Sequence, residues 1–288
     1  MAALFASLLS FIFRRNGARK LSTTSSIPGP PQPHVTLERD FISKFSEVIV
    51  VGDVHGCYHE LVEMLKAIQR DSSNNKVLKI FVGDLVNKGP KSKEVIKLFL
   101  ENQSLEGDQD MLSVRGNHDD IVIDQYLNVI KVNPTSLREK NEWMKQLTQQ
   151  EVDFLIKLPY SISIPCLNSI VVHAGILPGV LLQEMHPRDL VSMRNVISKV
   201  DPVSGATILT ATKEIDEGVP WAKTWKGPDT VYFGHDARRL FQQEPFAVGL
   251  DTGCVYGRQL TGIFIHGKRK GLVIKVPSVK AYVEVDKD

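Results

Sequence analysis

The fold of this chain is decided by the stretch Val48-Ile49-Val50-Val51-Gly52-Asp53-Val54-His55-Gly56. An apolar, β-branched run of this kind predicts a buried strand, and the polar residues that follow lie at the end of that strand. The pattern recurs as Gly83-Asp84 after the apolar residues 80–82, and as Gly116-Asn117-His118-Asp119 after residues 111–114. Because α/β sheets bind ligands at the carboxyl ends of their strands, we expect these side chains to meet at one edge.

Segments with helical spacing separate the three predicted strands. Apolar residues recur at helical intervals over 60–70, and residues 92–102 form a second segment rich in Lys and Glu. We therefore predict the order β-α-β-α-β, with strands at 48–51, 77–82 and 111–114. This order indicates a parallel sheet with right-handed crossovers, which places the chain in the α/β class.

The rest of the body, residues 38–288, is predicted to continue the same domain. A helix is expected from about residue 119 to residue 132, and a polar helical insert at 133–158 follows it, with a cap over the site as one role for the insert. Residues 161–164 and 169–173 are predicted to pair as a hairpin. The remaining expectations are a mixed, helix-rich region at 180–225 and strands at 230–233, 246–250, 262–266 and 272–276.

Charge and cysteine content exclude several classes of protein. The formal net charge is +2, but residues 1–37 hold four basic residues and no acidic one, which leaves 31 basic and 33 acidic residues in the remainder. A near-neutral body without a basic stripe gives no electrostatic reason to expect DNA as a partner. The three cysteines, Cys57, Cys166 and Cys254, are too sparse for a disulfide framework and indicate a reducing compartment. We expect Cys57 to be a small packed residue.

Residues 1–37 are predicted to be a targeting segment followed by a proline-rich linker. The apolar run 2–13 precedes Arg14-Arg15, and a Ser/Thr-rich, acid-free stretch comes next. This composition is typical of a mitochondrial presequence, whereas a secretory signal places its positive charge before the apolar run. Twelve apolar residues are short for a membrane-spanning helix, so no stable span is expected. The alternatives are a membrane anchor, or a disordered start on a cytoplasmic protein.

The side chains at the predicted sheet edge suit two divalent metal ions. Asp53 and His55 alternate on one strand end and therefore face the same side. Asp84 ends the neighbouring strand, so its carboxylate is placed to bridge two metals. The predicted ligands are Asp53, His55, Asp84, Asn117, His173 in Val171-Val172-His173, and His235 in Phe233-Gly234-His235. Oxygen and imidazole ligands without thiolate suit Mn, Fe or Zn, of which we favour Mn.

His118 is left over from this ligand set. Two metals about 4 Å apart hold a hydroxide and clamp a phosphoryl group for in-line attack. Since His118 adjoins the ligand Asn117, we expect it to lie over the leaving oxygen and to act as general acid. A lone histidine after a strand is usually a surface or core residue, as we expect for His266, but here several histidines share one glycine-flanked context.

Five ordered blocks resemble the phosphoprotein-phosphatase branch of calcineurin-like metallophosphoesterases: GDVHG (52–56), GDLVNKGP (83–90), GNHD (116–119), VHAG (172–175) and FGHD (233–236). Within that branch, Asp119 and the run LDTGCVYG (250–257) resemble the diadenosine tetraphosphatase (ApaH) subgroup. Lys88-Gly89-Pro90 is similar to the eukaryotic ApaH-like phosphatases. The resemblance covers residues 45–276 and implies a four-layer α/β/β/α sandwich with a central β-sandwich and a dinuclear metal site.

The resemblance also implies an activity, which is hydrolysis of phosphoanhydrides or phosphomonoesters. The expected partners are nucleoside polyphosphates such as diadenosine tetraphosphate, polyphosphate, capped RNA or another phosphorylated substrate. One alternative is a Ser/Thr protein phosphatase with the same chemistry. A second, of another class, is a non-catalytic metal-binding scaffold, which the complete ligand set disfavours. The oligomeric state is not predicted.

The chain departs from the Ser/Thr phosphatases at Asn87-Lys88, where they have Asp-Arg. Asn87 could accept a hydrogen bond from the catalytic His118, but it carries no full charge and would stabilise an imidazolium less. Lys88 is a compact point charge in place of a planar guanidinium, which favours polyphosphate oxygens of varied geometry. Tyr256 is predicted either to stack on a base or to be a packed aromatic residue. The predicted phosphate-binding residues are Lys88, Arg194 and Arg115, with Arg238 and Arg239 as close neighbours of the last histidine.

Overall fold

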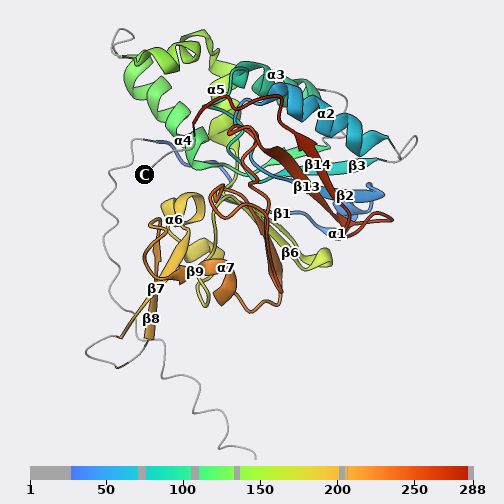
Figure 1. The fold of residues 1–288 in the computed structure, drawn as a ribbon, viewed down its shortest axis with the longest axis vertical. Coiled ribbons are helices and arrows are strands. Elements are labelled where there is room, and N and C mark those ends of the chain that lie inside the picture. The colour runs from blue at the N-terminus through green and yellow to red at the C-terminus, as the bar shows by residue number, and fades with distance from the viewer. Residues whose placement is uncertain are drawn as a thin grey trace, which may run out of the picture.

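The computed structural model describes residues 27–70, 76–104, 110–132, 137–200, 205 and 207–284. Two β-sheets lie face to face at the centre, and helices cover their outer faces (Figure 1). The predicted four-layer α/β/β/α sandwich is therefore confirmed. The predicted targeting segment falls on residues 1–26, outside the described ranges, and no described helix has the length and apolar character needed to cross a membrane.

The first sheet has the strand order β14-β13-β2-β3-β4. Its strands are β2 (Glu47–Val51), β3 (Val77–Phe81), β4 (Met111–Ser113), β13 (Gln259–His266) and β14 (Val273–Pro277). β2, β3 and β4 are parallel, whereas β13 and β14 add antiparallel pairs. The crossovers are α2 (Tyr58–Gln69) and α3 (Ser92–Ser104), so the predicted β-α-β-α-β core is confirmed.

The second sheet has the order β1-β5-β6-β10-β12-β11. Its strands are β1 (His34–Thr36), β5 (Ser161–Ile164), β6 (Ser169–Val172), β10 (Thr230–Phe233), β12 (Ala247–Gly249) and β11 (Gln242–Glu244). The predicted hairpin is present as antiparallel β5 and β6 around the short helix η4 (Pro165–Leu167). β1 pairs in parallel with β5, so residues 34–36 belong to the folded body rather than to the linker. Only three residues pair, which is too short to leave a periodic signal in the sequence.

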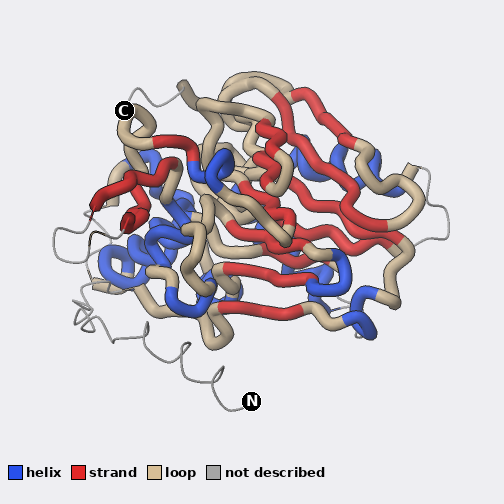
Figure 2. Tube along the Cα trace, turned by 90° about the horizontal axis from the view of Figure 1, so that it is seen from below, coloured by secondary structure: helices blue, strands red, loops and turns tan. Residues whose placement is uncertain are grey.

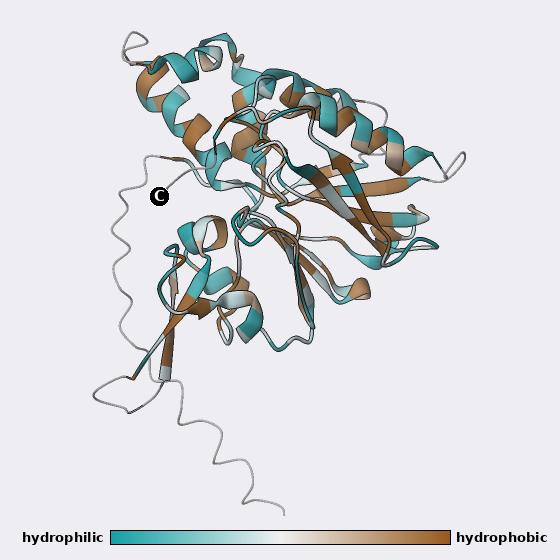
Figure 3. Ribbon diagram, in the orientation of Figure 1, coloured by the Kyte–Doolittle hydropathy of each residue, from teal (hydrophilic) through white to brown (hydrophobic). Residues whose placement is uncertain are grey.

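Successive side chains along each strand point to opposite faces of the sheet, and this produces three apolar layers. In β2, Ile49 and Val51 pack with the helices outside the first sheet, whereas Val48 and Val50 face the second sheet. In β6, Val171 lies between the sheets and its neighbour Val172 packs outward. The outer layer there is covered by α6 (Pro187–Ser192) and α7 (Trp221–Thr224). Figure 3 shows apolar strands inside and mixed helices outside, as expected for a sheet buried on both faces.

The region after β4 is helical, as predicted, but its helices begin and end at residues other than the expected ones. α4 (Asn117–Asp124) continues into the π-helical segment η1 (Gln125–Ile130). The predicted insert contains η3 (Glu139–Gln146) and α5 (Gln149–Lys157), which starts at a Thr148–Glu151 capping box. α5 packs against α3 and α4, and its Phe154 and Leu155 are buried in the core outside the first sheet. It therefore covers that sheet, and residues 137–158, the described part of the insert, do not line the cavity described below.

The expectation of a helix-rich region at 180–225 is wrong in its middle part. A three-stranded sheet lies there, with β7 (Asn195–Val200), β8 (Thr207–Thr212) and β9 (Val219–Pro220). Its β-branched residues, such as those of the run TILTAT (207–212), favour strands on a half-exposed surface. The β7–β8 hairpin lies at one end of the molecule in both Figure 1 and Figure 2. Short helices at α1 (Arg39–Ile42) and η5 (Leu182–Glu184) complete the described elements.

A buried ion pair joins the start of β2 to the turn between β13 and β14. The Arg269 guanidinium donates to both carboxylate oxygens of Glu47 at 2.6–3.2 Å, and the Arg269 main-chain N–H donates at 3.0 Å. The Glu47 side chain is only 3% exposed. Hydrogen bonding from Arg269 lowers the pKa of Glu47, so this carboxylate stabilises the fold in its charged form.

Replacing Arg269 by methionine is expected to lower the free energy of unfolding by about 3 kcal/mol at pH 7, because it leaves the Glu47 carboxylate buried without its partner. The folded-state pKa of Glu47 is depressed, so the stabilisation is present above the unfolded pKa and is lost as the pH falls through the folded value. The difference between wild type and variant should therefore shrink on acidification. Urea unfolding at several pH values measures it, with exposed Lys270→Met as control; equal stabilities at pH 7 would refute the role of the pair.

Candidate metal centre

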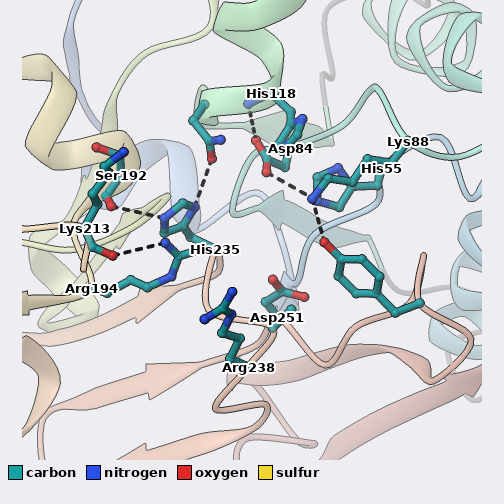
Figure 4. A pocket seen from close by; sticks show the side chains of 13 residues that line it. His55, Asp84, Lys88, His118, Ser192, Arg194, Lys213, His235, Arg238 and Asp251 are labelled. Carbon is teal, nitrogen blue, oxygen red and sulfur yellow. Dashed lines mark hydrogen bonds and ion pairs between the residues drawn. The ribbon is translucent and has the colours of Figure 1, made fainter. Parts of the chain in front are cut away.

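The Asp84 carboxylate lies at the centre of the predicted ligand set. Its oxygens are 3.4 Å from His55 Nε2 and 3.5 Å from His173 Nε2. Two compact groups of donor atoms share it, His55 with Asp84 and His118, and Asp84 with His173 and His235, and the atoms within each group lie within 4.8 Å of one another. Asp84 is thus placed where a bridging carboxylate would have to lie (Figure 4).

The other two predicted ligands lie in the same place. Asn117 Oδ1 is 2.9 Å from His173 Nε2 and 2.9 Å from His235 Nδ1. Asp53 is buried beside them and accepts the main-chain N–H of His235 at 3.1 and 3.3 Å. The structure therefore brings together all six residues that the sequence predicts as ligands, four from the first sheet's edge and two from the second sheet.

Three histidines turn a lone pair toward this centre. His173 Nδ1 lies 2.8 Å from Val82 O, His235 Nε2 lies 3.1 Å from Ser192 O, and His55 Nδ1 lies 3.3 Å from Val86 O. A neutral imidazole has one N–H, and in each ring it is directed to a main-chain carbonyl. The second nitrogen then presents its lone pair to the Asp84 and Asn117 oxygens. Metal-binding histidines are held in this way, so the donor set fits divalent cations.

Burial favours the neutral form of each of these groups. Burial, with the charges of Asp251 and Asp84, raises the pKa of Asp53 well above its usual range, and burial raises the pKa of Asp84 to about 7. Burial also lowers the pKa of His173 to about 4, and the pKa of His235 falls well below its usual range for the same reason. Neutral imidazole is the ligating form, and a divalent cation would reverse the shifts of the carboxylates.

Several of these side chains belong to residues whose backbone has a strained, left-handed conformation. Positive φ angles, which non-glycine residues rarely adopt, occur at His55 (47°), Asp84 (49°), Asn87 (72°), Lys88 (67°) and His235 (66°). Each such residue costs of order 1–3 kcal/mol and persists where the surrounding structure enforces it. Strain of this kind concentrates at functional sites, and here it falls on predicted ligands and on the predicted phosphate-binding turn.

Two glycines allow the carboxylates to approach the main chain. A Cβ atom at Gly116 would lie 2.1 Å from Asp84 Oδ1, and one at Gly234 would lie 2.0 Å from Asp53 Oδ1. Any other residue would displace the carboxylate it faces. This close approach is the physical reason for the glycine before Asn117 and before His235.

Asp119 has a positioning role that the sequence reasoning missed. Its carboxylate accepts the main-chain N–H groups of Asp84, Leu85 and Gly116 at 2.8–3.0 Å, and it is fully buried. It therefore ties the loop after β3 to the start of α4 and fixes the position of Asp84. Its place as the third residue after the N-cap Gly116, where acidic side chains bond back to the cap, was the available signal.

The hydrogen bond between Asn87 and His118 runs in the opposite direction from the predicted one. Its Nδ2 lies 3.0 Å from His118 Nδ1, and its Oδ1 accepts the main-chain N–H of Lys88 at 2.9 Å. The oxygen is already engaged, so Asn87 donates to His118 instead of accepting from it. His118 Nδ1 is then the acceptor and the ring proton is on Nε2. Burial, with the charges of Lys88 and His173, lowers the pKa of His118 to about 3.

A cavity of about 200 Å³ opens at this centre and is lined by cationic side chains. Lys88 lines it on the side of His55, and Arg194 lines it on the side of His235 (Figure 4). Arg194 is held by a hydrogen bond to Lys213 O at 3.2 Å. Two further cationic residues line the cavity: Arg238, which the sequence indicated only as a close neighbour of His235, and Lys213, which it did not indicate. Lys213 follows β8, a strand the sequence did not reveal, so nothing indicated its place.

Tyr256 and Asp251 come to the same cavity from the LDTGCVYG run. Lys88 Nζ donates to the Tyr256 hydroxyl at 2.6 Å and lies 5.1 Å from the centre of its ring. Asp251 is buried, and its carboxylate accepts the Gly253 N–H at 3.0 Å. Tyr256 therefore positions the ammonium group of Lys88, while Asp251 adds negative charge next to the ligand set.

Arg115 does not bind phosphate in this structure, which corrects the prediction. Its side chain is fully buried and donates to Pro28 O at 3.1 Å, to Asp120 Oδ1 at 3.1 Å and to Tyr160 OH at 3.4 Å, as well as to Ile156 O. It lies outside the cavity lining. Three of these partners, Pro28, Ile156 and Tyr160, come from segments distant in the sequence, and with Asp120 they hold the guanidinium outside the cavity.

Variants of the two arginines should therefore have different effects: an Arg115 variant should lower stability, and an Arg194 variant should weaken phosphate binding. Arg115→Met is expected to lower the free energy of unfolding by about 3 kcal/mol, because Asp120 loses its buried partner, and to leave affinity for inorganic phosphate unchanged. Arg194→Met should weaken phosphate binding about tenfold, the loss of one charge-assisted hydrogen bond, with little change in stability. Urea unfolding and calorimetric titration of Mn-loaded protein measure the two effects, and the reverse pattern would contradict these assignments.

The fold and this site are shared with known proteins. Residues 46–239 match the family described as calcineurin-like phosphoesterase. "Bis(5'-nucleosyl)-tetraphosphatase, symmetrical" of Coxiella burnetii is 30% identical over 280 residues, covering 77% of this chain and 89% of the relative. "Serine/threonine-protein phosphatase 1" of Salmonella typhimurium is 27% identical over 243 residues, covering 80% of this chain and 97% of the relative.

A solved structure agrees with these relatives. The "Crystal structure of a putative diadenosine tetraphosphatase" superposes with a TM-score of 0.69 and 35% identity, covering 86% of this chain and 98% of that one. The two sequence relatives named above are bacterial, so the resemblance to the eukaryotic ApaH-like branch stays a prediction. This chain belongs to the calcineurin-like phosphoesterase family and is a phosphoesterase hydrolase with ApaH-like homologues.

Proposed function

We propose that this hydrolase cleaves phosphoanhydride bonds in dinucleoside polyphosphates such as diadenosine tetraphosphate, with two divalent cations, Mn favoured. The observation that carries the proposal is that the Asp84-centred donor set lies at a cavity lined by four cationic residues, Lys88, Arg194, Lys213 and Arg238. A phosphomonoester offers one phosphate to such a cavity, whereas a polyphosphate chain offers several. The Coxiella relative and the similar solved structure are both named as tetraphosphatases of dinucleosides, which supports the same substrate class.

The donor set divides between two cations. Asp53, His55 and Asp84 would hold one, and Asp84, Asn117, His173 and His235 would hold the other. When bound, the cations lower the pKa of a water molecule that attacks phosphorus and polarise the phosphoryl oxygens. The remaining work falls to residues of the chain that hold the substrate and transfer a proton.

Lys88 and Arg194 would grip the reacting phosphate from opposite sides of the cavity (Figure 4). Lys88 carries its charge on a rotatable ammonium and Arg194 on a planar guanidinium, so the pair combines an adaptable contact with an oriented one. Lys213 and Arg238 line the same cavity and would neutralise the next phosphates of the chain. Tyr256 would offer its ring to a base while its hydroxyl holds Lys88.

His118 would supply the proton to the leaving oxygen. Its Nδ1 accepts from Asn87, so the proton is on Nε2, the nitrogen that remains for the substrate. Phosphate charge beside the ring would favour its protonated form and oppose the effect of burial. Asn87 is in this proposal a positioning residue, because it fixes the tautomer and the orientation of the ring.

A protein phosphatase is the second candidate, favoured by the similarity to the Salmonella enzyme. Capped RNA and polyphosphate share the phosphoanhydride bond and remain candidate substrates. A mitochondrial location, based on the composition of residues 1–37, is also part of the proposal. The non-catalytic scaffold is set aside, because the family match and the complete donor set both indicate a hydrolase.

The substrate is tested with the full chain supplied with Mn. We expect diadenosine tetraphosphate to give the highest kcat/KM in a panel with capped RNA, polyphosphate and a phosphopeptide, with two molecules of ADP as products if cleavage is symmetrical. Removing divalent cations with a chelator should abolish turnover, and adding Mn back should restore it. Turnover of the phosphopeptide alone would contradict the proposal and favour the protein phosphatase.

A Lys213 variant tests whether the cavity binds more than one phosphate of a polyphosphate chain. Lys213→Gln should raise KM for diadenosine tetraphosphate about tenfold, the loss of one charged contact, and leave KM for a small phosphomonoester almost unchanged. Lys199→Gln is the matched control, since Lys199 is also exposed but lies on β7 outside the cavity lining. Equal effects of the Lys213 variant on both substrates would show that Lys213 does not bind a distal phosphate.

A further inference from the structure

A second cluster of potential ligands lies at the start of α2, apart from the proposed catalytic set. The Cys57 and Cys254 thiols and the Glu60 carboxylate have donor atoms within 4.8 Å of one another. All three residues are buried, at 0%, 3% and 1% exposure. Cys57 and Glu60 belong to the chain around the N-terminus of α2, and Cys254 comes from the LDTGCVYG loop about 200 residues later. The tertiary fold therefore assembles the cluster.

Only one of the two Glu60 carboxylate oxygens accepts hydrogen bonds from described residues. Its Oε1 accepts Ser278 Oγ at 3.2 Å, Val279 N at 2.9 Å and Tyr282 OH at 3.0 Å. Its Oε2 is buried and has no hydrogen-bond partner among the described residues of the chain. Such an oxygen carries a substantial desolvation cost, and native structures rarely leave one without a ligand. The imbalance indicates a missing partner at this carboxylate, which lies close to both thiols.

We propose that Cys57, Cys254 and Glu60 bind a third divalent cation of thiophilic character, of which Zn²⁺ is the natural example. Two thiolates and one carboxylate are ligands that Zn²⁺ accepts in tetrahedral sites, with an oxygen such as water in the fourth position. Binding displaces the two thiol protons to solvent. The cation also gives Glu60 Oε2 the partner that it lacks. This site is independent of the proposed activity, because it shares no ligand with the Asp84 centre.

The position of the cluster gives the cation a structural role. It would link Cys57, which directly precedes α2 and lies two residues after His55, to the loop that carries Asp251 and Tyr256. The C-terminal segment joins the same place, because the Tyr282 main-chain N–H donates to Val255 O at 2.9 Å. A disulfide between Cys57 and Cys254 would also join the first two segments, but it would leave Glu60 Oε2 without a partner. The carboxylate therefore favours a cation over a disulfide.

Cobalt titration of the full chain tests the site directly. The protein is freed of metal under reducing conditions and titrated with Co²⁺, and the near-ultraviolet thiolate-to-cobalt charge-transfer band is recorded. The proposed catalytic ligands include no thiolate, so this band reports the cysteine site alone. We expect a saturable band in wild type and in Cys166→Ser, and loss of the band in Cys57→Ser and Cys254→Ser. Added Zn²⁺ should abolish it by displacing the cobalt.

Glu60→Gln supplies a matched variant, since the amide keeps an oxygen for Ser278, Val279 and Tyr282 but removes the anionic ligand. It should weaken Co²⁺ binding at least about tenfold, the lower end of what even outer-shell partners contribute. If the serine variants fail to fold, the wild-type and Glu60→Gln titrations still decide. No charge-transfer band in reduced wild type, or an intact-mass loss of two hydrogens that persists under mild reduction as a Cys57–Cys254 disulfide, would overturn the proposal.

Discussion

The structure depends on holding one buried carboxylate, that of Asp84, at the seam between two sheets. Its oxygens face the ring nitrogens of His55 and His173, and it accepts the main-chain N–H of His118 at 2.8 Å. Keeping it there requires a left-handed backbone at Asp84, a glycine at position 116 and the hydrogen bonds of Asp119. Each requirement costs conformational freedom or stability, and divalent cations would offset that cost by binding the carboxylate.

The two-sheet architecture explains how distant segments share this carboxylate. The ends of β2 and β3 deliver Asp53, His55 and Asp84, while β6 and β10 of the second sheet deliver His173 and His235. The apolar layer between the sheets fixes their separation, because close-packed side chains leave little freedom to slide. A rigid sandwich can thus hold the donor atoms of these side chains in fixed positions around one point. Loops, which are more mobile, would hold them less precisely.

The sequence predicted which side chains meet at this centre because glycine-flanked polar residues at strand ends have a local cause, the close approach that Gly116 and Gly234 permit. It could not predict the direction of Arg115, whose partners Pro28 and Ile156 are tertiary neighbours. The amide orientation of Asn87 depends on one main-chain N–H, which no pattern encodes. The β7–β8 hairpin was missed because its residues are mostly exposed and lack the apolar alternation of a core strand. The common burial of free cysteines predicted that Cys57 is a small packed residue, and it is fully buried in the core, but the sequence could not show that Cys254 and Glu60 lie beside it.

In the proposed function Asp84 would be a ligand shared by two cations, and electron paramagnetic resonance of the Mn-loaded full chain tests this most directly. With two equivalents of Mn²⁺ bound, the account predicts the low-temperature multiline spectrum of a spin-coupled pair. Asp84→Asn should convert this spectrum to that of isolated Mn²⁺ ions, because the bridging carboxylate is lost. Spectra of isolated Mn²⁺ in the wild type at full occupancy would contradict the account, since the two ions would then share no bridging ligand.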